Sequence, residues 1–288
     1  MLAEIISGLS IGSVYVLLAL GFTLTLGVGD MVNLAHGATV VAGMYVVYTL
    51  VTALGLNAYV GVVLAGVVCA LLSAVVYVVA IVPSRSAGGG HNLQVVYTLV
   101  LSSLLVIIFQ LVWGGQLVGL PFRQTEPWRI LGVPVDPARG IAFFVAVALS
   151  AVFMVWLRYS FSGRLMRMTG RYTEGAYAIG VPVQWVFVAV FCLGGAMAGV
   201  AGGLLMTIQP VSPTLGFGFL IVALIVSIAA RLSMFGVVLV GFFYGIAQAV
   251  LNSLIDPSLT SVVIFVAFLA ILSIERVVST TSNRARRA

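Results

Sequence analysis

The sequence predicts an all-α, polytopic integral membrane protein with eight or nine transmembrane or re-entrant helical segments. Hydrophobic residues make up 62% of the 288 residues and charged residues only 7%, where soluble domains have about 25%. The mean hydropathy is +1.24. A soluble fold of this length has too little polar cover for so much apolar surface. Residues 1–288 are therefore expected to form a single membrane domain without a soluble domain.

Apolar windows of about 20 residues, the length that crosses a bilayer, give the expected segments in order. They are 5–27, 31–53, 58–82, 92–113, 141–157, 183–208 and 258–274. A further apolar region, 217–254, is interrupted by Arg231. Its first piece, 217–230, is short for a full crossing. It is interpreted as half of a broken or re-entrant helix, or as a crossing that continues past the arginine.

The distribution of arginine predicts the orientation in the membrane. The chain has 13 basic residues, all of them arginine. If the N-terminus is outside, the cytoplasmic side receives Arg85, the arginines of the 158–182 loop and those after residue 274, while Arg123, Arg129 and Arg139 lie outside. This excess of cytoplasmic arginine follows the positive-inside rule. It predicts a cytoplasmic C-terminus with a basic tail over residues 277–288.

Composition also excludes several functions. Without lysine the chain cannot contain a phosphate-binding loop of the G-x-x-x-x-G-K-[ST] type, so we do not expect it to be an enzyme that hydrolyses ATP. Cys69 and Cys192 lie inside apolar stretches, which argues against a disulfide framework or a metal site. The arginines flank apolar spans, as topology signals do, and do not indicate a nucleic-acid groove.

Residues 27–37 interrupt the apolar pattern with three glycines and several polar side chains. Asn33 and His36 are three residues apart and share one face if the segment is helical. Polar groups at membrane depth are costly unless they are paired or line a water-filled path. Two interpretations carry equal weight: Asn33, His36 and Gly37 contribute to a substrate path, or they form a turn in which Asn33 and His36 cap helix ends.

Small residues indicate close helix packing in the segment 183–208. Gly195, Gly199 and Gly203 repeat every four residues, and Gly194, Ala198 and Gly202 form an adjacent row. In lipid such rows allow two helix backbones to approach closely. Ordinary packing is favoured here over a sliding contact of a transporter core.

Arg231 also has two interpretations. A guanidinium inside an apolar region needs a partner, a cavity or the interface, so it could contact an anionic group of a cargo or a partner subunit. Alternatively the chain turns there and Arg231 extends to the membrane surface. The turn is the favoured interpretation.

Several motifs resemble one family. Residues 8–15 (GLSIGSVY), 19–24 (ALGFTL) and 32–37 (VNLAHG) look like the opening of the permease subunits of branched-chain amino acid ABC importers, where the last motif usually reads [IV]NFAHG. The similarity continues through 159–182, 194–203 and 216–251, and so covers nearly the whole chain. The chain departs from the family at 229–233, which reads AARLS where a Gly-Gly-x-Gly-Ser turn is usual.

The resemblance implies that the 158–182 loop is a cytoplasmic coupling loop that docks into a groove on an ATP-binding subunit. The residues expected to make this contact are Arg164, Arg167, Arg171, Glu174, Gly175, Ala176 and Gly180. The alternative is a solvated basic loop that serves only the positive-inside rule.

The resemblance further implies a permease subunit of an ATP-driven importer in the bacterial inner membrane. The cargo would be a branched-chain amino acid or a related small polar solute such as an amide, urea or a small carboxylate. Two ATP-binding subunits would use ATP and Mg, an extracytoplasmic solute-binding protein would deliver cargo, and this chain would hold no cofactor. A second homologous permease would complete the path, and a heterodimer is favoured over a homodimer.

The alternative function is an ion- or proton-coupled carrier without an ATPase partner. Such carriers place acidic or histidine relays inside their spans. The seven acidic residues of this chain lie in loops or near span ends, so the importer is favoured. A non-transporting scaffold would leave the polar segment 27–37 unexplained.

Overall fold

A computed structural model describes residues 1–86, 90–121, 126–130, 132–256, 259–260, 262–268 and 270. The described elements, in chain order, are α1 (Leu2–Thr23), η1 (Leu24–Val28), α2 (His36–Leu54), α3 (Ala58–Val76), η2 (Tyr77–Ile81), α4 (Val82–Ser86), α5 (Gly90–Trp113), β1 (Trp128–Ile130), β2 (Val133–Val135), α6 (Pro137–Tyr159), α7 (Phe161–Arg171), α8 (Thr173–Ala178), α9 (Val183–Met206), η3 (Pro213–Leu215), α10 (Gly216–Ala229) and α11 (Met234–Leu254).

The described part of the chain has seven helices that are long and apolar enough to cross a membrane, and Pro213–Ala229 is a shorter apolar helix. This confirms the all-α membrane class, and the expected number of segments is approximately right. Of the expected span 258–274, the described residues 259–260, 262–268 and 270 are helical. The rest of that span and the predicted basic tail 277–288 lie outside the described residues.

Two local features differ from the expectations. The second span begins at His36 and not at residue 31, because residues 29–35 leave the helix and Asp30 adopts a left-handed backbone with φ 50°. The loop 113–139 contains an antiparallel hairpin in which Trp128 pairs with Val135 and Arg129 with Pro134. Strands this short, with a proline in one of them, give almost no pattern in the sequence.

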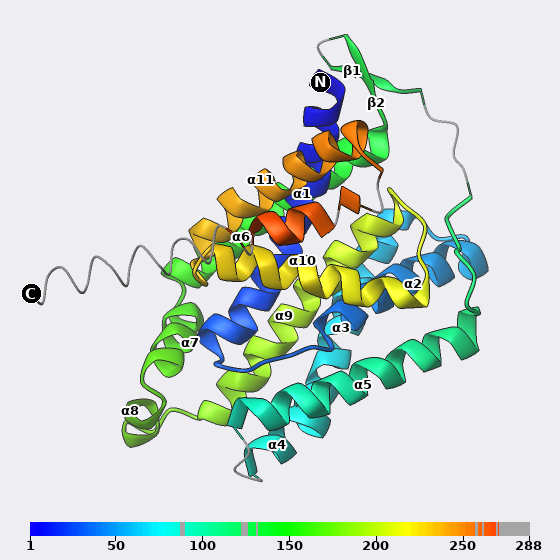
Figure 1. Ribbon diagram of the computed structural model, residues 1–288. Coiled ribbons are helices and arrows are strands. Elements are labelled where there is room, and N and C mark those ends of the chain that lie inside the picture. The colour runs from blue at the N-terminus through cyan, green and yellow to red at the C-terminus, as the bar shows by residue number, and fades with distance from the viewer. Residues whose placement is uncertain are drawn as a thin grey trace, which may run out of the picture.

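Helix α9 lies at the centre of the molecule (Figure 1), and its two glycine rows lie against different neighbours. A Cβ at Gly195 or Gly199 would overlap backbone or side-chain atoms of Cys69 and its neighbours on α3. A Cβ at Gly202, in the adjacent row, would overlap the Val40 carbonyl of α2. The four-residue spacing thus allows α9 to pack closely against two helices at once.

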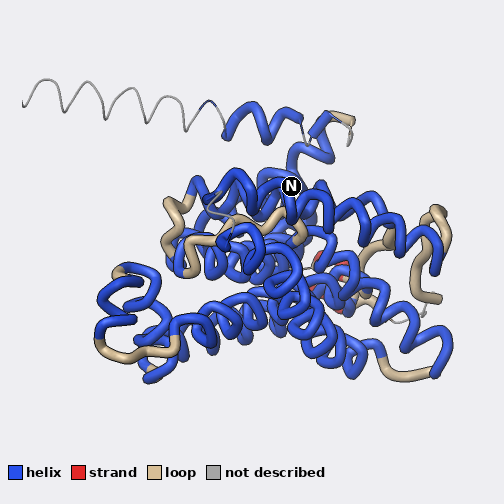
Figure 2. Tube along the Cα trace, turned by 90° about the horizontal axis from the view of Figure 1, so that it is seen from below, coloured by secondary structure: helices blue, strands red, loops and turns tan. Residues whose placement is uncertain are grey.

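Helices α1 and α11 make a similar close contact. A Cβ at Gly8 would lie 2.9 Å from the Gly245 carbonyl oxygen, and a Cβ at Gly12 would lie 3.1 Å from the Gly241 carbonyl oxygen. Side chains at these positions would force the two helices apart. Figure 2 shows that helices make up almost all of the molecule and that strands are confined to one short hairpin.

The two ends of the bundle carry different structures. The N-terminus and the β1–β2 hairpin lie at one end, and α7 and α8 project from the other (Figure 1). The first end is held together by Arg139, whose Nη1 donates to the Ser7 hydroxyl at 2.6 Å. The second end is where the candidate functional residues gather.

Candidate functional site

The polar segment between α1 and α2 is an ordered break in the helices. The helix α1 ends in the π-helical turn η1, and the Met31 N–H donates to the Thr25 carbonyl at 3.2 Å. Asn33 is buried, and its Oδ1 accepts a hydrogen bond from the Ala35 N–H at 3.0 Å, immediately before α2. His36 Nε2 donates to the Leu18 carbonyl at 3.1 Å, which ties the start of α2 to the middle of α1.

The Asn33 contact is that of a turn before α2, whereas His36 binds a carbonyl in the middle of α1 and caps no helix end. The His36 ring also packs edge-on against Phe22, with ring centroids 5.5 Å apart. Gly37 lies against α10, where a Cβ would overlap the Gly216 carbonyl. His36 and Gly37 therefore position α2 against α1 and α10, and Asn33 stabilises the turn before α2. Their direct contribution to a substrate path stays a prediction.

Two residues that the sequence analysis missed complete the break. The Val32 N–H donates to Gln94 Oε1 at 3.0 Å, and the Leu34 N–H donates to Thr98 Oγ1 at 3.1 Å. Both side chains are on α5 and buried. Backbone groups that leave a helix inside a membrane need such partners. The signal in the sequence is a pair of polar residues four apart, hence on one face of an otherwise apolar helix.

The predicted coupling loop forms two short helices, α7 and α8. Ser160 caps α7 by accepting a hydrogen bond from the Gly163 N–H at 2.9 Å, as serine does at helix N-termini. The chain breaks at Tyr172 and continues as α8. Gly180 then closes α8 with φ 78°, a left-handed conformation that glycine adopts without strain.

The arginines of α7 have two different environments. Arg164 Nη1 donates to the Tyr159 carbonyl at 2.6 Å, and Arg167 donates to the Leu157 and Arg158 carbonyls. Both side chains thus bind the last carbonyl groups of α6, where cations stabilise a helix end. Arg171 lies at the other end of α7 and, like Arg164, is exposed. Of the seven predicted contact residues, Arg164 and Arg167 therefore act first as links to α6.

The remaining predicted contact residues lie around α8. Glu174, Gly175 and Gly180 are exposed, whereas Ala176 is buried against the body of the molecule. Large apolar side chains are exposed immediately before and after α8: Tyr172 at 72% and Ile179 at 69%. A surface of aromatic and aliphatic side chains next to charged ones is typical of a protein–protein contact.

The α1–α2 break and the predicted coupling helices are in direct contact. A Cβ at Gly170, on α7, would overlap the Val28 carbonyl at the end of η1. Arg85 Nη2 donates to the Gly29 carbonyl at 3.3 Å, and its guanidinium lies 4.5 Å from the centroid of the Phe187 ring. A displacement of α7 would therefore reach the first residues of the α1–α2 break without passing through any other element.

The α10–α11 turn lies at the same place. A Cβ at Gly27 would lie 3.2 Å from Leu232 Cβ. Arg231 and Leu232 both have positive φ angles, 52° and 56°, and Arg231 is exposed. This is the turn that the favoured interpretation of Arg231 expects. A role of Arg231 in the substrate path stays a prediction.

A separate pocket lies between α1, α10 and α11, with a volume of about 430 Å³. It is not lined by Asn33, His36, Gly37 or Arg231. In the described ranges, no group of three or more histidine, cysteine, aspartate or glutamate residues could hold a metal ion.

Comparison with known proteins places these features in a family. The family model described as branched-chain amino acid transport system, permease component, matches residues 4–272. The chain is 27% identical to the high-affinity branched-chain amino acid transport system permease protein LivH of Escherichia coli strain K12, over 94% of this chain and 92% of that protein. It is 25% identical to the corresponding protein BraD of Pseudomonas aeruginosa, over 86% of this chain and 85% of that protein.

A similar relation holds for an archaeal protein and for one solved structure. A probable branched-chain amino acid transport permease protein LivH of Methanocaldococcus jannaschii is 27% identical, over 82% of this chain and 76% of that protein. The structure of PsaBC from Streptococcus pneumoniae in complex with Fab matches with a TM-score of 0.51 at 14% identity, over 94% of this chain and 89% of that chain. This last likeness concerns the fold alone.

Proposed function

The chain belongs to the branched-chain amino acid transport system permease family, and we propose that it carries a branched-chain amino acid or a related small polar solute inward. It is a permease subunit of an ATP-driven transporter, and ATP hydrolysis lies in partner subunits. The resemblance seen in the sequence is thereby confirmed. We further propose two ATP-binding subunits that use ATP and Mg, a second, non-identical permease, and an extracytoplasmic solute-binding protein.

The observation that carries the proposal is the contact between the coupling helices and the α1–α2 break. Gly170 packs against the Val28 carbonyl, and Arg167 holds the end of α6. A partner that binds the exposed surface of Tyr172, Glu174 and Ile179 would therefore move α7 against η1 and α6 together. Packed elements transmit such rigid-body displacements because they do not deform continuously.

The proposed topology follows from the two ends of the bundle. The N-terminus and the β1–β2 hairpin lie at the outer face of the inner membrane, where a solute-binding protein would deliver cargo. Helices α7 and α8, together with Arg85 and the α10–α11 turn, lie at the cytoplasmic face. The two ends lie apart in space (Figure 1), and the arginine distribution supports this orientation.

The double replacement of Arg171→Ala and Glu174→Ala tests the coupling surface. Both side chains are exposed on α7 and α8, so the spans should fold normally. We expect the variant complex to lose most of its cargo-stimulated ATPase activity and its import of radiolabelled L-leucine into vesicles. The control is Gln110→Ala, an exposed polar residue on α5 outside α7, α8 and the β1–β2 hairpin, which should leave coupling unchanged.

Affinity purification of the tagged chain from gently solubilised membranes tests the assembly. Mass spectrometry should identify an ATP-binding subunit and a second permease among the co-purifying proteins. Recovery of the chain alone, with solute movement in liposomes that needs no ATP, would replace the importer by the carrier alternative. Normal cargo-stimulated ATPase activity in the double variant would remove the coupling role of α7 and α8.

A further inference from the structure

The pocket between α1, α10 and α11 has the composition of a ligand site. Its volume of about 430 Å³ lies within the range of small-molecule pockets, about 300–1,000 Å³. Four of its lining side chains are polar: Tyr15, Gln209, Tyr244 and Gln248. They come from α1, from α11 and from the segment after α9, so the fold brings together residues that lie more than 200 positions apart.

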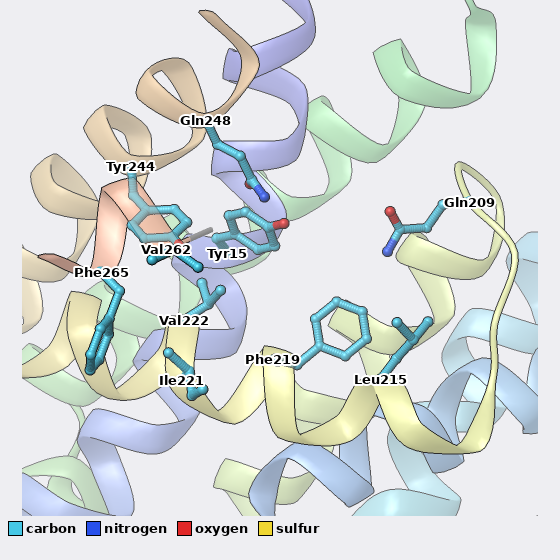
Figure 3. Close-up of a pocket in the computed structure, with 11 residues that line it drawn as sticks. Tyr15, Gln209, Leu215, Phe219, Ile221, Val222, Tyr244, Gln248, Val262 and Phe265 are labelled. Atoms are coloured by element: carbon cyan, nitrogen blue, oxygen red, sulfur yellow. The ribbon is translucent and has the colours of Figure 1, made fainter. Parts of the chain in front are cut away.

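The polar groups of the pocket are arranged around an apolar wall (Figure 3). Gln248 extends from α11 toward the Tyr15 ring, and Gln209 faces the cavity across Phe219. The Tyr15 and Tyr244 rings meet edge-on, with centroids 5.7 Å apart. Gln248 Oε1 is buried without a hydrogen-bond partner among the described residues. A side-chain hydrogen bond to Tyr15 holds the Gln248 amide beside the cavity. Rotation of that amide would let a bound ligand give Oε1 the partner that a buried polar atom needs.

Charge defines which ligand fits. Aspartate, glutamate, arginine and histidine are all absent from the described lining. A ligand with a net charge would lose its hydration there without gaining a counter-ion, which is costly. The cost of dehydration is smaller for a zwitterion or a neutral molecule. Amide groups bind its carboxylate or amide, and the faces of aromatic rings attract an ammonium group. Apolar side chains such as Val222 and Phe265 suit a short aliphatic tail.

The location of the pocket suits a site for incoming cargo. Gln209 belongs to the segment between α9 and η3, and Val211 in that segment pairs with Val118, in the stretch that leads to the β1–β2 hairpin. The pocket therefore adjoins the end of the bundle proposed to face outward. Gly218, on α10, is exposed at its wall, which leaves the cavity accessible.

We propose that this pocket binds the cargo before it crosses the membrane, and that it selects small amphipathic molecules of zero net charge. Gln209 and Gln248 bind the polar end of the molecule, and Phe219, Val222 and Phe265 enclose its aliphatic end. The proposal rests on the proposed import function for the identity of the cargo, but the binding site can be tested without transport.

The test uses a thiol introduced by Gly218→Cys in the purified complex with its partner subunits. A Cβ at Gly218 would meet no heavy atom within 4 Å, so the replacement fits. Gly115→Cys is the matched control, because Gly115 also has open space around it and does not line the pocket. Alkylation by a small maleimide is followed by mass spectrometry of the peptide that contains each position, with L-leucine, L-lysine or L-glutamate present.

We expect L-leucine to slow alkylation at position 218 about tenfold when its concentration is about ten times the half-protecting value. L-lysine and L-glutamate should leave the rate unchanged, and position 115 should respond to none of the three. Adding Gln248→Leu to Gly218→Cys should raise the half-protecting leucine concentration about tenfold, as the loss of one hydrogen bond to a charged group does. The control Gln110→Leu, exposed on α5, should not.

Each other outcome has a defined meaning. If leucine protects neither position from alkylation, or protects positions 218 and 115 equally, the proposal that the pocket binds cargo is refuted. Equal protection by lysine or glutamate overturns the selection by charge, and protection that survives Gln248→Leu unchanged overturns the role of that amide. ATP-driven import of leucine without protection refutes the pocket and leaves the proposed function standing. Protection without import refutes the proposed function and leaves the binding site standing.

Discussion

Replacing Gly199 by alanine tests whether the glycine row of α9 sets the distance between α9 and α3. The added Cβ would overlap the Ala65 carbonyl oxygen and lie 2.5 Å from Cys69 Cβ and 2.9 Å from Cys69 Sγ. Two of these three atoms are backbone or directly attached to it. The clash can therefore be relieved only by separation of the two helices, and not by rotation of a flexible side chain.

The expected magnitude follows from two opposing effects. Overpacking of a well-packed interior costs about 1–3 kcal/mol. Alanine regains up to about 1 kcal/mol relative to glycine through its higher helix propensity. Because all three neighbouring atoms lie under 3.0 Å from the added Cβ, the cost lies at the upper end, about 2–3 kcal/mol. The free energy of unfolding should therefore fall by about 1–2 kcal/mol, with Gly218→Ala as the control. Gly218 lies in α10 with open space around its Cβ position, so this variant should be as stable as the parent chain or more stable.

Equilibrium unfolding of the purified protein in mixed detergent micelles measures both variants against the parent chain. Loss of stability in Gly199→Ala together with an unchanged or increased stability in Gly218→Ala supports the reasoning. If Gly199→Ala were as stable as the parent chain, the close approach of α3 and α9 would not depend on the absence of a side chain. The packing role assigned to Gly195, Gly199 and Gly203 would then be wrong.

The remaining predictions concern hydrogen bonds and turns, and the same unfolding measurement checks them. Gln94→Leu removes the acceptor of the Val32 N–H and should cost about 1–3 kcal/mol. Gln110→Leu on the exposed face of the same helix should cost almost nothing, and equal losses would contradict the assignment. Leu232→Gly relieves a left-handed φ of 56° and should add up to about 1 kcal/mol. Ser233→Ala removes the N-cap of α11 and should cost about 1 kcal/mol. A stabilised Ser233→Ala would contradict the cap.

Hydropathy was sufficient to predict the spans because a segment that crosses the lipid bilayer must carry mostly apolar side chains. The five spans that precede the coupling loop and the span α9 are all found near their expected positions. The start of α2 was misplaced because residues 31–35 are apolar enough to continue a helix, and hydropathy does not register the hydrogen bonds that draw them away. Those bonds come from Gln94 and Thr98, about 60 residues further along the chain.

The sites were harder to predict than the spans for the same reason. Asn33 and His36 attract attention as polar residues in an apolar stretch, yet their partners are nearby backbone groups. Tyr15 and Gln248 appear unremarkable in their own helices, and they line one pocket only because Gly8 and Gly12 allow α11 to approach α1 closely. A binding site of this type depends on helix-to-helix distances, which a linear pattern of polarity does not contain.

The pocket and the predicted coupling helices both contact α1 and its continuation η1. Tyr15 on α1 lines the pocket, and the Val28 carbonyl at the end of η1, which continues α1, contacts Gly170 of α7. Between them, His36 holds α2 to α1 through the Leu18 carbonyl, so that α1 cannot shift without α2. A displacement imposed on α7 would therefore change the position of Tyr15 relative to α10 and α11. Cargo affinity in the pocket and the state of the coupling helices should then depend on each other, because linkage between two sites is reciprocal.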